Sequence, residues 1–108
     1  MSKVIDQLYE IVLERKAQPA EGSYTCYLFE QGLDKILKKC GEEAAEVIIA
    51  AKNGSRDELK AEIGDLIYHL LVLMAETGLP LEELYELLEE RRQKIGNLKT
   101  MKQTNKDS

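Results

Sequence analysis

The chain has 108 residues, of which 44% are hydrophobic and 32% are charged, a composition typical of one soluble globular domain. Its 15 basic and 20 acidic residues give a net charge of −5, which argues against nucleic-acid binding through a basic face. The longest apolar run, Leu70 to Ala75, is too short to span a bilayer, no secretion signal is recognisable, and two isolated cysteines fit a reducing compartment. We therefore expect a cytoplasmic protein with no membrane or nucleic-acid partner.

The first half of the chain predicts helices and no strand. Helical spacing of apolar residues runs from about Lys3 to Lys16, and the Pro- and Gly-containing residues 18–23 end this helix. A short helix capped by Ser23 or Thr25 should follow, up to Gln31. The next long helix is expected over about 33–52, because its apolar residues form a continuous stripe.

The second half predicts two further helices. Asn53-Gly54 is a strong helix stop, and Ser55 with Glu58 forms a capping box that begins a helix running to about Thr77. After Gly78-Leu79-Pro80, a last helix should reach Arg91-Arg92. The expected fold is an all-α, four-helix bundle with one additional short helix, in a domain over 1–96, followed by a polar and flexible tail over 97–108.

The helix that ends near Thr77 is apolar on nearly every side from Leu66 to Ala75. A helix that is apolar all round must be buried all round, and 108 residues hardly supply enough neighbours within one subunit. We therefore expect a homodimer that completes the bundle through this helix. The core face of the helix is expected to be formed by Leu59, Ile63, Leu66, Leu70 and Leu73.

Two acidic clusters stand on successive helices, Glu42-Glu43-x-x-Glu46 and Glu62-x-x-Asp65. Residues three apart share a helical face, so antiparallel packing would bring four of these carboxylates together. Such a group repels itself unless cations compensate, and hard oxygen ligands suit Mg²⁺, with Mn²⁺ as the alternative. The other interpretation, acidic residues on two solvated faces, is disfavoured by the duplicated spacing.

Basic residues precede the first acidic cluster. Lys35, Lys38 and Lys39 could neutralise the phosphates of a substrate, or could pair with the neighbouring glutamates along the helix; Lys35 and Lys39 share a face and are the better candidates. His69, one turn beyond Asp65, is interpreted first as a core residue and second as a support for the cluster.

These segments resemble the phosphoribosyl-ATP pyrophosphatase family, the histidine-biosynthesis branch of the all-α, MazG-like nucleoside triphosphate pyrophosphohydrolases. The resemblance spans about Val4 to Arg92 and is carried by residues 19–25, 35–46, 50–54 and 62–71. The paired acidic motifs are shared across the superfamily and indicate only the reaction type. The Ser-Tyr-Thr segment and the contexts of the two acidic motifs select the histidine-pathway branch.

The resemblance implies hydrolysis of phosphoribosyl-ATP at the α–β phosphoanhydride, which gives phosphoribosyl-AMP and pyrophosphate in the second step of histidine biosynthesis. It assigns the metal to Glu43, Glu46, Glu62 and Asp65, and gives Glu42 the task of orienting a ligand or the attacking water. The resemblance thus implies that these five acids form the catalytic set. Substrate contacts are expected from Ser23, Thr25, Lys35, Lys38, Lys39, Lys52 and Asn53.

The family domain is often fused to the phosphoribosyl-AMP cyclohydrolase of the next step, and the length here predicts the free-standing form. The resemblance suggests functional coupling to that enzyme. Two other functions stay open. The chain could be a housecleaning pyrophosphohydrolase that acts on noncanonical nucleotides, or a non-catalytic helical dimerisation module.

Overall fold

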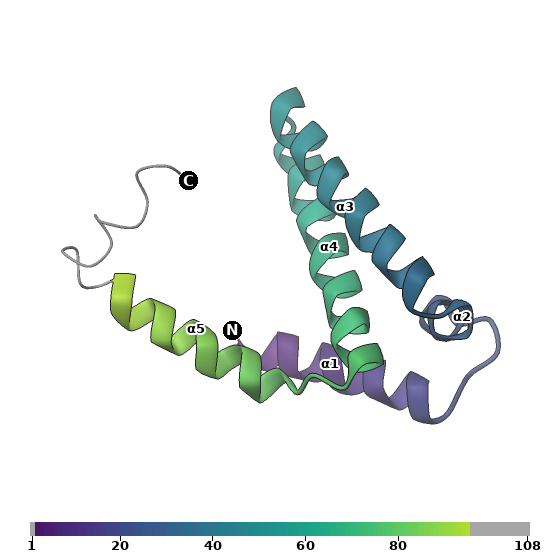
Figure 1. The fold of residues 1–108 in the computed structure, drawn as a ribbon. Coiled ribbons are helices and arrows are strands. Elements are labelled where there is room, and N and C mark those ends of the chain that lie inside the picture. The colour runs from purple at the N-terminus through teal and green to yellow at the C-terminus, as the bar shows by residue number, and fades with distance from the viewer. Residues whose placement is uncertain (1, 96–108) are drawn as a thin grey trace. The chain divides into compact units, whose positions relative to one another are not determined.

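The computed structural model describes residues 2–95, and all regular structure in this range is helical. The helices are α1 (Ser2–Ala17), α2 (Tyr24–Gln31), α3 (Leu33–Asn53), α4 (Arg56–Thr77) and α5 (Leu81–Ile95) (Figure 1). The predicted all-α class, with four long helices and one short one, is confirmed. The tail expected over 97–108 lies outside the described residues.

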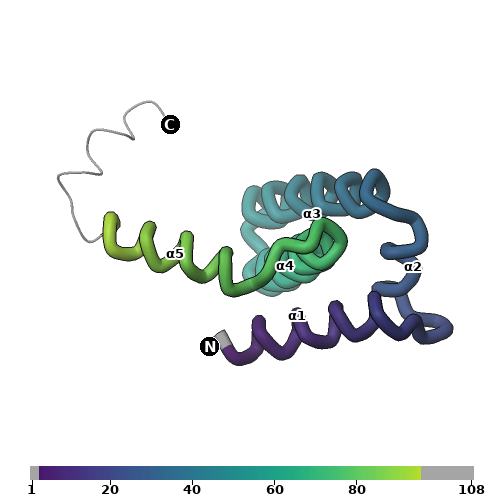
Figure 2. Tube along the Cα trace, turned by 60° about the horizontal axis from the view of Figure 1, so that its bottom comes forward, coloured from purple at the N-terminus to yellow at the C-terminus, as the bar shows by residue number. Residues whose placement is uncertain are grey.

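The chain divides into two compact units, one ending at Gly78 and the other beginning at Leu79. In the first unit, α3 and α4 pack against each other as an antiparallel pair, and α1 and α2 both contact α4 (Figures 1 and 2). Helix α2 also contacts α3 and α1. The second unit contains α5. No helix among residues 2–95 is both long enough and apolar enough to cross a membrane.

The turn between α3 and α4 is short and capped at both sides. Gly54 has φ +76°, in the left-handed region that glycine adopts readily, and its N–H donates to the Ala51 carbonyl at 3.2 Å. The Ser55 hydroxyl accepts a hydrogen bond from the Glu58 N–H at 3.2 Å. The helix stop and the helix start predicted here are confirmed, and together they fold α4 back along α3.

The core of the first unit lies where its four helices meet. One fully buried side chain comes from each helix: Val12, Leu28, Ile36 and Val72. Burying an aliphatic side chain of this size contributes about 1.5–3 kcal/mol. These contacts hold α3 and α4 in the register that positions their acidic residues.

The core face predicted for α4 is partly wrong. Ile63 and Leu70 are 41% and 40% exposed, whereas Leu59, Leu66 and Leu73 are half-buried. The buried residues lie nearer the C-terminal end, where α1 packs against α4 in addition to α3. They are His69, Leu71, Val72, Met74 and Ala75.

Burial of α4 on every side does not occur within a single copy of the chain. Ile67 is 37% exposed, and with Ile63 and Leu70 it forms an exposed apolar row, because residues spaced by four and three share a helical face. Completion of this face by a second copy stays a prediction.

Candidate metal centre

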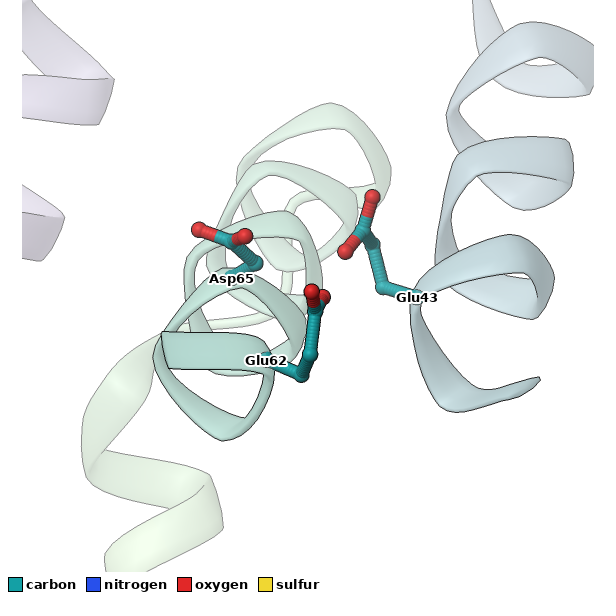
Figure 3. A group of neighbouring side chains, drawn as sticks. All are labelled: Glu43, Glu62 and Asp65. Carbon is teal, nitrogen blue, oxygen red and sulfur yellow. The ribbon is translucent and has the colours of Figure 1, made fainter. Parts of the chain in front are cut away.

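Three carboxylates from two helices come together on the facing sides of α3 and α4. Glu43 of α3 reaches toward Glu62 and Asp65 of α4 (Figure 3), and one oxygen from each lies within 4.8 Å of the others. Glu43 is buried, Glu62 is half-buried and Asp65 is exposed, so the cluster is open to solvent on one side. Carboxylate oxygens at this spacing are suited to a hard divalent cation.

The carboxylates act on each other electrostatically. Partial burial raises the pKa of Glu62, and the negative charges of Glu46, Glu43 and Asp65 raise it further, as does a hydrogen bond with Glu43. A group of anions whose neighbours disfavour ionisation is stabilised by a bound cation. The donor set therefore fits a divalent metal ion.

Glu46, the fourth expected ligand, does not belong to the group of three. It is exposed and lines an adjoining groove of about 200 Å³, together with Ile49, Ala50, Glu58 and Glu62. Glu46 and Glu62 thus share one space although they come from different helices.

Lys39 pairs with the acidic motif that follows it on α3. Its Nζ lies 3.2 Å from Oε1 of Glu42 and 3.8 Å from Oε2 of Glu43, and the hydrogen bond with Glu42 is the main reason that the pKa of Lys39 is raised. The predicted pairing along the helix is present for this lysine. The Lys39 ammonium group therefore lies directly beside the carboxylate cluster. Glu42, its other partner, is not a member of that cluster.

The other expected lysine contacts differ in position. Lys35 lies with its Nζ 5.8 Å from the centroid of the Tyr27 ring, one turn before Lys39, and Lys38 is exposed. Lys52 and Asn53 are exposed in the last turn of α3. Lys52 is nine residues beyond Glu43, or roughly 13 Å along the helix axis, so the structure does not bring it to the cluster.

Ser23 and Thr25 both have structural partners. The Ser23 hydroxyl caps α2 by accepting a hydrogen bond from the Cys26 N–H at 3.2 Å. The Thr25 hydroxyl is hydrogen-bonded to the hydroxyl of Tyr68 and so ties α2 to α4. Both residues organise the helix that stands next to the cluster.

Two aromatic residues connect α2 with the cluster. The Tyr24 hydroxyl lies 3.0 Å from Nε2 of His69, and Nδ1 of His69 lies 2.7 Å from the backbone carbonyl oxygen of Asp65. Because a carbonyl only accepts, Nδ1 is the donor, and in the neutral ring Nε2 accepts from Tyr24. His69 is 5% exposed, as the core interpretation predicts.

Sequence reasoning missed the link from Tyr24 through His69 to the backbone of Asp65. Tyr24 stands between Ser23 and Thr25 in the motif, and a tyrosine on a short helix gives no periodic signal. The sequence did offer one signal, because a tyrosine at a helix junction needs a hydrogen-bond partner for its hydroxyl. His69, the one histidine of the chain, was a candidate for that partner.

Comparison with known proteins gives a match over most of the chain. The model of the phosphoribosyl-ATP pyrophosphohydrolase family matches residues 5–92. This range includes all five acids of the two sequence motifs, from Glu42 to Asp65.

Individual relatives match at high identity. A phosphoribosyl-ATP pyrophosphatase of Clostridium botulinum (strain Hall) is 55% identical over 103 residues, which cover 95% of this chain and 94% of that protein. One of Listeria innocua is 55% identical over 102 residues, 94% of this chain and 98% of that protein. A histidine biosynthesis bifunctional protein HisIE of Thermoanaerobacter pseudethanolicus is 61% identical over 85 residues, 79% of this chain but only 39% of that longer protein.

Proposed function

The chain belongs to the phosphoribosyl-ATP pyrophosphohydrolase family, and from this premise we propose that it hydrolyses phosphoribosyl-ATP at the α–β phosphoanhydride in histidine biosynthesis. The products are phosphoribosyl-AMP and pyrophosphate. Family membership confirms the resemblance drawn from the sequence motifs and makes the chain a hydrolase. The observation that carries the proposal is the carboxylate cluster of Glu43, Glu62 and Asp65, which lies within the matched range.

In this proposal Glu43, Glu62 and Asp65 hold Mg²⁺, with Mn²⁺ as the alternative, and Glu46 turns from the adjoining groove to join them. The bound cation supplies positive charge that polarises the attacking water and offsets charge on the leaving pyrophosphate. Glu42, or whichever acid is left free, accepts the proton of the water. The lysines of α3 bind the substrate phosphates.

Lys39 is the phosphate-binding residue that the geometry favours. It is one-quarter exposed at its side chain and already stands beside Glu43, so its ammonium group can leave Glu42 for a phosphate oxygen without leaving the cluster. Lys35, one turn earlier, extends the positive surface along α3. An ammonium group binds phosphate through charge-assisted hydrogen bonds, and both lysines can therefore neutralise the part of the polyphosphate that the metal leaves exposed.

Water attacks phosphorus directly in this proposal, with no covalent enzyme intermediate. The two free cysteines are Cys26, which is buried, and Cys40, whose pKa is raised by burial, and a thiol with a raised pKa is a poor nucleophile at neutral pH. Single-turnover hydrolysis in ¹⁸O-labelled water tests this step. We expect label in one product in the first turnover, whereas unlabelled products would mean that an enzyme oxygen attacked first.

We propose that the working form is a cytoplasmic homodimer. The apolar row of Ile63, Ile67 and Leu70 on α4 is about 40% exposed in the single chain, and contiguous exposed apolar surface is typical of an interface. The phosphoribosyl-AMP product would pass to a cyclohydrolase. The bifunctional relatives carry "Histidine biosynthesis bifunctional protein" in their names, which supports coupling between successive steps of the pathway.

The proposed activity is tested by measuring pyrophosphate release from phosphoribosyl-ATP, from ordinary nucleoside triphosphates and from damaged ones, with and without Mg²⁺. We expect release from phosphoribosyl-ATP to be fastest and to require the metal. Preference for a damaged nucleotide would favour the housecleaning function instead. A folded protein that releases pyrophosphate from none of them would favour a non-catalytic module.

A further inference from the structure

Two tyrosine rings of α2 are exposed, and one of them, Tyr24, is linked through His69 to the backbone of Asp65 in the carboxylate cluster. Tyr24 is 45% exposed and Tyr27 is 40% exposed, and their ring centroids are 6.0 Å apart with 25° between the ring planes. Both line an open depression of about 420 Å³ at the start of α2. Exposed aromatic rings that are nearly parallel offer flat apolar surface to a planar ligand.

The Tyr24 ring is held in one orientation from its buried side. Its hydroxyl is hydrogen-bonded to His69, which is itself hydrogen-bonded to the Asp65 carbonyl, and the His69 ring meets the Tyr24 ring edge-on at 5.8 Å and 75°. Because the Tyr24 hydroxyl is hydrogen-bonded to the buried His69, the polar end of this side chain is held toward the protein interior. The exposed part of the ring is therefore presented to solvent without having to reorganise.

Charged groups of the metal centre lie within electrostatic reach of this ring. Burial raises the pKa of the Tyr24 phenol, while the charge of Lys39 lowers it and that of Glu43 raises it. The ammonium group of a second lysine, Lys35, lies 5.8 Å from the centroid of the Tyr27 ring. Tyr27 is thus close to Lys35, and Tyr24 is within the electrostatic influence of Lys39 and of Glu43 from the carboxylate cluster.

We propose that the adenine base of the substrate stacks on the exposed ring of Tyr24, flanked by Tyr27, while the phosphates reach Lys39 and the metal. This inference rests on the proposed function and adds a residue that recognises the base. Phosphoribosyl-ATP has a flat aromatic base, which can stack on a tyrosine ring, and several phosphates, which can bind lysine and a metal ion. Stacking of a base on an aromatic side chain is commonly worth about tenfold or more in affinity.

A purely structural role for Tyr24 can be distinguished from base binding, because a second tyrosine hydroxyl also forms a hydrogen bond between α2 and α4. The hydroxyls of Thr25 and Tyr68 also link α2 to α4, yet Tyr68 is half-buried and not exposed. Tyr68→Phe removes a hydrogen bond between the helices and keeps the Tyr68 ring, whose centroid lies 6.3 Å from that of the Tyr24 ring. It is the matched control for loss of a tyrosine hydroxyl.

The kinetic experiment compares Tyr24→Leu, Tyr24→Phe and Tyr68→Phe. Tyr24→Leu should raise KM for phosphoribosyl-ATP about tenfold with kcat nearly unchanged, because the ring binds the base and takes no part in the chemistry. Tyr24→Phe keeps the ring and should stay within about threefold of wild-type KM, and Tyr68→Phe should keep wild-type KM. Equal KM in Tyr24→Leu and wild type would overturn the proposal, as would a fall in kcat alone.

A binding experiment with the wild-type protein covers the case in which Tyr24→Leu does not fold. The probes are the product phosphoribosyl-AMP and ribose 5-phosphate, which has no base. Ring-current shifts of assigned Tyr24 proton signals in NMR spectra should occur with phosphoribosyl-AMP and not with ribose 5-phosphate. Bound product without a Tyr24 shift would overturn the inference.

Two further results have a defined meaning. If Tyr24→Leu weakens association between copies of the chain and leaves KM unchanged, the rings are covered by a second subunit and the inference is wrong. Wild-type protein that does not hydrolyse phosphoribosyl-ATP contradicts the proposed function itself, whereas active wild type with an unaffected Tyr24→Leu variant contradicts only the stacking.

Discussion

Lys39 and Glu43, one turn apart on α3, form an ion pair with 3.8 Å between Nζ and Oε2, and the same Glu43 carboxylate belongs to the cluster with Glu62 and Asp65. Glu43 therefore lies between a cation on its own helix and two anions on the next. In the proposed function, a divalent ion bound by Glu43 would compete with Lys39 for its negative charge, and the lysine would then be released for phosphate.

Replacing Lys39 by Gln should weaken substrate binding without weakening Mg²⁺ binding. KM for phosphoribosyl-ATP should rise about tenfold, the order of one lost charge-assisted contact, while affinity for Mg²⁺ should stay the same or increase because a neighbouring positive charge is gone. Steady-state kinetics and a Mg²⁺ titration measure the two effects. Lys3→Gln, at an exposed lysine of α1, is the control; weaker Mg²⁺ binding in Lys39→Gln would contradict the assignment.

Glu46→Gln tests the acid that the structure leaves in the adjoining groove. The change keeps the shape and removes the charge, so hydrolysis should fall by at least about a hundredfold if Glu46 joins the metal. Without metal, the free energy of unfolding should be unchanged or higher, because one contribution to carboxylate repulsion is lost. A Glu46→Gln enzyme with wild-type activity would remove Glu46 from the site.

The all-α fold and the order of its helices could be predicted because local signals agree with each other. Gly54 and Ser55 fix the turn between α3 and α4, and the acidic spacing then puts Glu43 opposite Glu62. What could not be predicted depends on tertiary packing. Which residues of α4 are buried is decided by α1, and periodicity within α4 carries no information about that neighbour.

The fine structure of the site is also a tertiary property. Glu43 and Glu46 are three residues apart and share a face, yet only Glu43 comes within the group of three, whereas Glu46 lines the adjoining groove with Glu62. The contact between Tyr24 and His69 joins residues 45 positions apart. No short-range pattern in the sequence specifies that pairing.

The pH dependence of stability should report on Glu62. Its folded-state pKa is raised above the ordinary value of 4.5, so the folded chain holds this proton more tightly than the unfolded chain. The metal-free protein therefore loses stability as pH rises from 4.5 through the raised pKa. Glu62→Gln should lack this loss, and its advantage in urea unfolding should grow toward neutral pH and disappear at lower pH; an advantage that does not change with pH would contradict this explanation.

Ile67→Glu tests the expected dimer interface on α4. A carboxylate at the centre of the exposed apolar row would be buried without a partner in the dimer, so the dissociation constant should rise at least tenfold. Sedimentation equilibrium across micromolar concentrations measures it. Val4→Glu, at a 67% exposed position of α1, should leave assembly unchanged, and a wild-type protein that is already monomeric at these concentrations would rule out the dimer.

The central claim is that the cluster around Glu43 binds the divalent cation used in hydrolysis, and a calorimetric Mg²⁺ titration of wild type and Glu43→Gln tests it most directly. The substitution keeps the side-chain shape and removes the charge of the one buried carboxylate in the cluster. We predict saturable binding to wild type and at least about tenfold weaker binding to the variant, with pyrophosphate release reduced in parallel. Equal Mg²⁺ affinity in the two proteins would contradict the account.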